Sequence, residues 1–155
     1  MGFLHNLKLW LSPLRMTDPD FGTLLFMRSS KAPERSYWEC EWIFPATGAV
    51  IAIALPGGEG GPMQEARHFY LDLPHRFAQI MVACRPGLEQ VLDYRLHQRL
   101  PADIFTVAKV SGFGLGKPRN QPPRWEITFE TIGKKWLGIT IPFVGDTAME
   151  AVVDT

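Results

Sequence analysis

The sequence predicts an α+β fold: an antiparallel sheet of five to seven strands with a broken helical segment, about residues 62–100, packed on one face. Three observations predict it. Residues 62–100 are the only long segment in which apolar residues follow a helical period. Segments with strand-like alternation lie on both sides of it. The connections between the first of these strands are too short for crossovers, which favours antiparallel pairing.

The length of 155 residues is typical of one domain. We expect an extension over residues 1–16, followed by a single α+β domain over residues 17–155. The extension places its apolar side chains on one face of a short amphipathic helix. Two uses of this helix remain open: it docks on the domain or on a second copy of the chain, or it binds a membrane surface.

Three strands are expected before the helical segment, at residues 21–28, 37–44 and 49–55. Residues 17–20 are expected to form a turn or cap ahead of them. In the second strand Glu39 and Glu41 alternate with large apolar residues, so one face is buried and the other is solvated. The third strand has no polar face, which suits an interior position in the sheet.

The helical segment repeats its apolar residues at spacings of three and four, which keeps them on one face. Pro74 and Pro86 each remove a backbone hydrogen bond and crowd the preceding turn. We therefore expect a kink or break at each proline, leaving two or three shorter helices that share one buried face. The predicted buried stripe is Ala66, Tyr70, Leu73, Phe77, Ile80, Cys84, Leu88 and Val91.

Beyond the helical segment, residues 104–110 are expected to form a strand and residues 111–123 a Gly- and Pro-rich loop. Residues 125–132 and 135–143 then form a hairpin that turns at Gly133-Lys134. Apolar side chains alternate along both arms, so each arm buries one face. Residues 149–153 add a last short strand or fray.

Two glycine-rich segments follow predicted strands, at residues 57–61 and 112–117. Phosphate-binding loops have this composition, but they lead into a helix whose first N–H groups bind the anion. The first segment lacks the Lys-Ser/Thr pair of a P-loop and is followed by Pro62. The second leads into Pro118 and no helix. We therefore interpret both as connections, and no cofactor is expected.

Sixteen basic and sixteen acidic residues cancel, so the formal net charge is zero. A broad basic face for nucleic acid is therefore not expected. Cys40 and Cys84 lie in apolar patterns, and we interpret them as buried free thiols, which suits a reducing compartment. No apolar run approaches the ~18 residues that indicate a membrane-spanning helix. These observations favour a cytoplasmic location.

No catalytic or metal-binding constellation stands out in the sequence. His68 and His75 are separated by a proline, and no His-Glu-x-x-His motif or Cys-His cluster is present. Cys84 lies on the apolar stripe, which favours a core residue over a nucleophile. Glu39 and Glu41 share the solvated side of a strand, where carboxylates are usually not catalytic. The sequence leans against an enzyme, and no catalytic or metal-binding residue is assigned.

Aromatic residues exceed what one helix-covered sheet face is expected to bury, and those left on a face or edge favour a protein-binding surface. The alternative is that the N-terminal helix covers them. The segment 112–124 is locally basic, so an acidic partner surface fits there. The candidate partner-binding residues from these two observations are Tyr37, Trp38, Trp125, Trp136, Lys117, Arg119 and Arg124.

The chain carries the motif Asp18-Pro19-Asp20-Phe21-Gly22, followed by a Trp-rich strand, the helix start Gln64-Glu65-Ala66-Arg67 and the pattern Trp125-x-Ile127-x-Phe129. In this order of signals it resembles a group of small, uncharacterised bacterial domains that open with Asp-Pro-x-Phe-Gly. Some similar domains look like immunity proteins of bacterial toxin systems. The resemblance covers most of residues 17–146. Its motifs are turn and core residues, so it transfers no catalytic residue.

The leading functional hypothesis is a non-catalytic cytoplasmic protein-interaction module, and the resemblance implies an immunity-like role in which a partner protein is bound and neutralised. A second copy of the chain is another candidate partner. Two alternatives remain open. One is a small-ligand-binding protein or hydrolase with a pocket near residues 112–117. The other is a peripheral membrane protein attached through residues 1–16.

Overall fold

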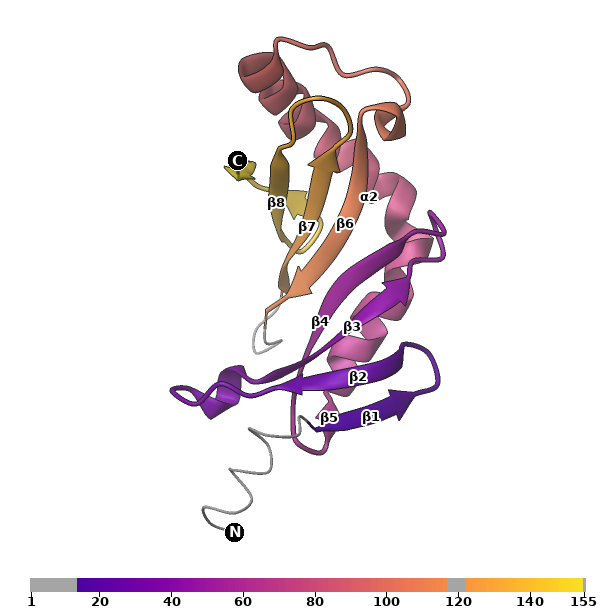
Figure 1. Cartoon of the computed structure of the whole chain (residues 1–155), viewed down its shortest axis with the longest axis vertical. Coiled ribbons are helices and arrows are strands. Elements are labelled where there is room, and N and C mark those ends of the chain that lie inside the picture. The colour runs from indigo at the N-terminus through magenta and orange to yellow at the C-terminus, as the bar shows by residue number, and fades with distance from the viewer. Residues whose placement is uncertain (1–13, 117–121, 155) are drawn as a thin grey trace.

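The protein has an α+β fold, as the sequence predicts. The computed structural model describes residues 14–116 and 122–154. In this part of the chain a mixed sheet of ten strands packs against one long helix, α2 (Gln64–Leu96). Figure 1 shows α2 running behind the sheet along most of the length of the molecule. The sheet is larger than the predicted five to seven strands, and it is not purely antiparallel.

The strands form one continuous path across the sheet, in the order β1-β2-β3-β4-β6-β7-β8-β10, with β5 paired to β4 and β9 paired to β8. Two short 3-10 turns, η1 (Pro33–Arg35) and η2 (Ile104–Thr106), precede β3 and β6. The strands are β1 (Arg15–Asp18), β2 (Gly22–Met27), β3 (Tyr37–Ile43), β4 (Val50–Gly58), β5 (Gly61–Pro62), β6 (Ala108–Leu115), β7 (Arg124–Thr131), β8 (Gly138–Val144), β9 (Thr147–Ala148) and β10 (Val152–Asp154).

The strands β4 and β6 pair in parallel, and this is where the expectation of an antiparallel sheet is wrong. The pairing joins Ala52 to Gly112, Ile53 to Phe113 and Ala54 to Gly114; we call these three residue pairs the seam. The helix α2 lies between β4 and β6 in the chain, so it acts as the crossover connection that parallel strands require. The other pairings along the path are antiparallel.

The helix α2 is continuous through Pro74 and Pro86, so the predicted division into two or three shorter helices is wrong. An interior proline costs about 3 kcal/mol, whereas each large apolar side chain that is buried contributes about 1.5–3 kcal/mol. Nine buried side chains therefore outweigh two prolines. The predicted stripe is confirmed at all eight positions, and Leu92 extends it. After Leu96 the chain turns at His97, whose φ of 53° is left-handed.

Two segment predictions are corrected by the structure. Residues 104–106 form η2, and the strand that follows, β6, continues to Leu115, inside the predicted loop. Gly112 and Gly114 made this segment resemble a loop in the sequence. In the structure they are alternate residues of a strand, so both lie on the same side of β6. Arg15 and Met16, at the end of the predicted N-terminal extension, belong to β1. Residues 1–13, which hold the predicted amphipathic helix, lie outside the described residues, so that helix and its membrane role stay predictions.

The Asp-Pro-x-Phe-Gly motif fastens the first hairpin to α2. The Asp18 carboxylate accepts hydrogen bonds from the backbone N–H groups of Asp20 and Phe21, at 2.8 Å and 3.1 Å. Arg67, in the first turns of α2, pairs with both Asp18 and Asp20. Its guanidinium also lies 5.4 Å from the centroid of the Phe21 ring. The motif therefore has a structural role: it positions β1 and β2 against the start of the helix.

Tyr70 connects α2 to the seam. Its side chain is fully buried, and its hydroxyl donates a hydrogen bond to the Ala54 carbonyl at 2.6 Å. The Phe113 carbonyl, on the neighbouring strand, lies 3.4 Å from the same hydroxyl. Burial raises the pKa of Tyr70, so the hydroxyl remains protonated and able to donate. One side chain thus contacts both strands of the seam from the helix side.

Replacing Tyr70→Phe should lower the free energy of unfolding by about 1–2 kcal/mol, because a buried carbonyl loses its donor. Urea unfolding followed by circular dichroism measures the change. Tyr94→Phe is the matched control, since Tyr94 lies on the same helix and is 77% exposed. Equal stabilities for the two variants would show that the hydroxyl does not hold the seam.

Candidate functional site

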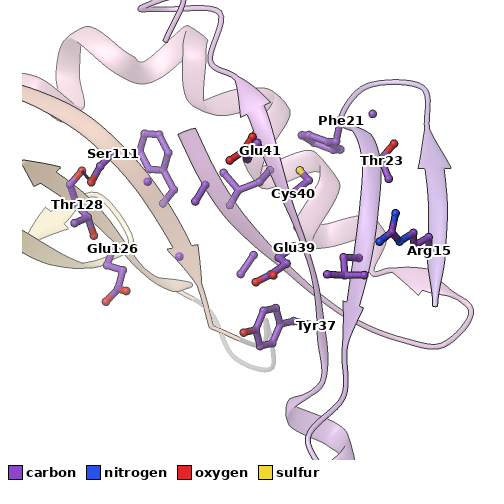
Figure 2. A pocket seen from close by; sticks show the side chains of 18 residues that line it. Arg15, Phe21, Thr23, Tyr37, Glu39, Cys40, Glu41, Ser111, Glu126 and Thr128 are labelled. Atoms are coloured by element: carbon purple, nitrogen blue, oxygen red, sulfur yellow. Dashed lines mark hydrogen bonds between the residues drawn. The ribbon is translucent and has the colours of Figure 1, made fainter. Parts of the chain in front are cut away.

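The sheet has a second face that α2 does not cover, which we call the open face. Its side chains alternate along the strands with the buried residues that face the helix. A groove of about 940 Å³ lies on it, centred on the seam and reaching from β1 and β2 across to β7. Figure 2 shows Glu39 and Glu41 on β3 and, on the other side of the seam, Ser111, Glu126 and Thr128. This groove is the candidate functional site.

Small residues form the floor of the groove. Each of the two central strands contributes two of them on the open face, Ala52 and Ala54 from β4 and Gly112 and Gly114 from β6. The backbone geometry requires the glycine at 112, because a Cβ there would lie 2.9 Å from the Ala52 carbonyl oxygen. The close approach of the two strands and the bare floor therefore have the same cause.

Carboxylates stand on both sides of this floor. The strand registers place Glu39, Ala54, Gly114 and Glu126 in one row across four neighbouring strands. Three strand spacings separate the two glutamates, which corresponds to roughly 14 Å between their backbones. Glu126 leans over the floor, since a Cβ at Gly114 would meet its Cγ and Oε1 at 3.1 Å. The row is therefore acidic at both walls.

The next row is also polar. Glu41, Ala52, Gly112 and Thr128 follow one another across the same strands. The Thr128 hydroxyl lies 3.3 Å from the Thr140 hydroxyl, one strand further out. The Ser111 hydroxyl donates to the Thr128 carbonyl at 3.2 Å. The groove thus carries carboxylates near its floor and satisfied hydroxyl groups on the β7 side.

Beyond the second row the open face becomes apolar. Ile43 and Val50 are directly paired at the hairpin end of β3 and β4, and both belong to the open-face set by alternation. They are 66% and 61% exposed. A cross-strand pair of β-branched side chains normally packs against other apolar groups. Here the pair lies on the open face, one row beyond the lining residues Glu41 and Ala52, as an exposed apolar end.

No lysine or arginine pairs with Glu39, Glu41 or Glu126 within residues 14–116 and 122–154. Lys109 does pair with Glu130 on the same face, at 3.5 Å. Arg15 is the one cation that lines the groove among the described residues, and it lies on β1, two strands away from Glu39. The negative charge of the groove is therefore left uncompensated along its walls.

Neither cysteine is a ready nucleophile. Burial raises the pKa of the Cys40 thiol to about 11, and the charges of Asp18 and Glu39 add to that shift. Burial also raises the pKa of Cys84 to about 12. Since the thiolate is the reactive form, both thiols are unreactive at neutral pH. The groove lining contains no histidine among the described residues. The chemistry that the groove offers is cation attraction and hydrogen bonding.

The structure separates the sequence-predicted partner-binding residues. Trp38 and Trp125 are 1% and 4% exposed, so the expectation that their rings form an exposed surface is wrong. They face the helix, and their indole N–H groups donate to the carbonyls of Gly58 and Gly145 at 2.7 Å and 2.8 Å. These two residues anchor turns to the core and do not present a surface.

The remaining predicted residues do not form one patch with the groove. Tyr37 is half-buried and lines it from β3. Trp136 is 51% exposed and lies against Gly138, on the far side of β7. Arg124 is exposed at the start of β7. Lys117 and Arg119 lie outside the described residues, so their partner-binding role stays a prediction.

Sequence reasoning missed Glu126 and the small residues of the floor. It also treated Glu39 and Glu41 as ordinary solvated carboxylates. The pattern in the sequence that could have indicated the floor is the pair of alternating small-residue motifs, Ala52-x-Ala54 and Gly112-x-Gly114. The two motifs indicate one shared floor only when β4 and β6 are known to be neighbours in the sheet.

The described residues contain no group of three or more His, Cys, Asp or Glu side chains placed to hold a metal ion. His68 and His75 lie on the continuous helix α2, two turns or roughly 10 Å apart, which is too far for a shared ion. In the part of the chain that the structure describes, no helix combines the length and apolar character needed to cross a bilayer.

Comparisons with protein-family models, with curated proteins and with solved structures give no match to this chain.

The close contact at Gly112 makes a direct prediction. Gly112→Ala should lower the free energy of unfolding by about 1–3 kcal/mol, because the new methyl group meets backbone that cannot move aside. Thermal and urea unfolding measure the loss. Gly60→Ala is the control, since nothing lies within 4 Å of a Cβ at that position. A neutral Gly112→Ala variant would contradict the described seam.

Because burial raises the pKa of both thiols, we expect the free energy of unfolding to fall at high pH. In the unfolded chain a thiol has a pKa of about 8.5, so the unfolded state releases these protons first. The stabilisation is complete below about pH 8 and is lost as the pH rises toward the native pKa of Cys40, about 11. Each thiol should contribute a slope of about 1 kcal/mol per pH unit between those values.

Urea unfolding between about pH 8 and about pH 10.5 measures this slope, and the double variant Cys40→Ala, Cys84→Ala should show a shallower one. The comparison of slopes removes the contribution of lysines and tyrosines, which both proteins share. Identical slopes would contradict burial of protonated thiols.

Proposed function

We propose that this protein is a non-catalytic protein-interaction module and that it binds its partner on the open face of the sheet, through the groove over the seam. The observation that carries the proposal is the groove itself, where Glu39, Glu41 and Glu126 face solvent without ion pairs among the described residues. Uncompensated charge that surrounds a shaped depression is the arrangement that steers a complementary partner and fixes its orientation.

The division between the two faces supports the same function. The helix face holds most of the large aromatic residues, while the open face holds a floor of small residues, charged walls and an exposed apolar pair. The open face extends across a path of eight paired strands, so a partner can contact several strands at once. The proposed action is immunity-like: the module occludes a surface of its partner, in the cytoplasm.

A small-ligand-binding protein is the second candidate. The groove volume of about 940 Å³ falls within the range of small-molecule sites. Such sites, however, are mainly apolar and enclose their ligand, whereas Glu41 and Glu126 are exposed here. The hydrolase version has less support, because the Ser111 hydroxyl is hydrogen-bonded to a carbonyl and no histidine adjoins it among the described lining residues.

The proposal predicts that filling the groove abolishes binding. Ala52→Trp places a large ring on the exposed floor at a position where a strand tolerates tryptophan. Ala78→Trp adds the same ring on the solvent side of α2 and serves as the control. Wild-type and variant proteins are used in parallel to capture proteins from the native host, and the captured proteins are identified by mass spectrometry.

We expect a protein that is captured by wild type and by Ala78→Trp but lost with Ala52→Trp. Calorimetry with that purified protein should then show a loss of at least about tenfold in affinity for Ala52→Trp alone, or about 1.4 kcal/mol. Equal affinity of the three proteins for every purified partner would show that the open face is not the binding surface.

A further inference from the structure

The walls of the groove define the charge of what binds there. Three carboxylates line the floor, and three strand spacings, or roughly 14 Å, separate the backbones of the flanking strands. The one lining cation among the described residues, Arg15, lies at the far edge of the groove. A partner that brings no positive charge would desolvate these carboxylates without compensation, which is costly.

The floor defines the shape. Ala52, Ala54 and Gly112 carry little side-chain bulk, so another backbone can approach them closely, whereas Glu126 covers the floor at Gly114. The floor runs along the strands, and its rows repeat every two residues, or roughly 7 Å. An extended segment repeats its side chains at the same interval. A helix would instead bury an apolar face in a groove of apolar side chains, whereas this floor is flanked by carboxylates and carries only the methyl groups of Ala52 and Ala54.

The apolar end adds a second requirement. Ile43 and Val50 lie one row beyond Glu41 and Ala52, and about two rows, roughly 13 Å, beyond Glu39. The pair is highly exposed although it is made of two β-branched side chains. An occupant that extends along the groove from the Glu39 row reaches this pair with the side chain about four residues further along.

From these three features we infer that the groove binds an extended, cationic protein segment. Lysine or arginine side chains of this segment pair with Glu39, Glu41 and Glu126, and one or two apolar side chains pack on Ile43 and Val50. The inference rests on the proposed function and names the chemistry of the partner. The exposed ion pairs contribute little individually, so selectivity comes from the combination of charge at one end and apolar contact at the other.

Defined peptides test this chemistry. The probe is a fluorescein-labelled octapeptide in which lysine and threonine alternate in the first half and valine and threonine in the second. One comparison peptide has glutamate in place of lysine, and another has serine in place of valine. Fluorescence anisotropy measures binding to the full chain at low and at high salt.

The lysine–valine peptide should bind at least about tenfold more tightly than the glutamate peptide, and its affinity should fall with added salt. The variant E39Q/E41Q/E126Q should lose this preference. The control variant E34Q/E65Q/E150Q removes three exposed charges elsewhere and should keep it. The serine peptide should bind wild type more weakly than the lysine–valine peptide does. On the variant Ile43→Ser/Val50→Ser the two peptides should bind with equal affinity.

The inference is overturned if the lysine–valine peptide does not bind, if it binds no better than the glutamate peptide, or if the groove variant and the control variant bind it equally. The proposed function fails separately. A purified partner that is lost with Ala52→Trp but unaffected by E39Q/E41Q/E126Q would keep the open face as the binding surface and refute its preference for a cationic segment.

Discussion

The close parallel pairing of β4 and β6 is the constraint on which the rest of the structure depends. Within residues 14–116 and 122–154, backbone pairing joins the strands β1–β4 to the strands β6–β10 at only three residue pairs. The helix α2 crosses behind both groups and buries its stripe against them, and Tyr70 bonds to the seam from that side. The residues that let the two backbones meet, chiefly Gly112, also leave the open face bare. Stability and the candidate site therefore arise from the same small residues.

The two faces of the sheet have different roles: one forms the core with α2, and the other is exposed. Large aromatic residues point to the helix, where Trp42, Phe44 and Tyr70 form edge-to-face contacts in one connected cluster. Indole N–H groups at Trp38 and Trp125 find carbonyl partners in turns, as buried indoles generally do. An abundance of aromatic residues in a small domain therefore need not indicate a binding surface. In this protein the charged and small residues of the opposite face carry that role in our proposal.

The fold within each segment was largely predictable from local patterns. The stripe of α2, the alternation in β3 and the hairpin of β7 and β8 follow from periodicity, because burial on one face demands it. The expectation that Pro74 and Pro86 divide the helix was wrong, because it considered the cost of an interior proline without the tertiary packing of the helix. In the folded chain nine buried side chains hold the helix together across both prolines.

The sequence by itself determined the α+β class and the buried faces of α2 and β3, since apolar periodicity encodes the buried face of each element. It also placed the charges of Glu39 and Glu41 on the solvated side of their strand. Only the tertiary structure decided that β4 lies beside β6, and hence that Glu126 faces the same groove as Glu39. The physical reason is that strand neighbours separated by a long helix are chosen by packing across the whole sheet. A local sequence pattern therefore does not indicate that β4 pairs with β6.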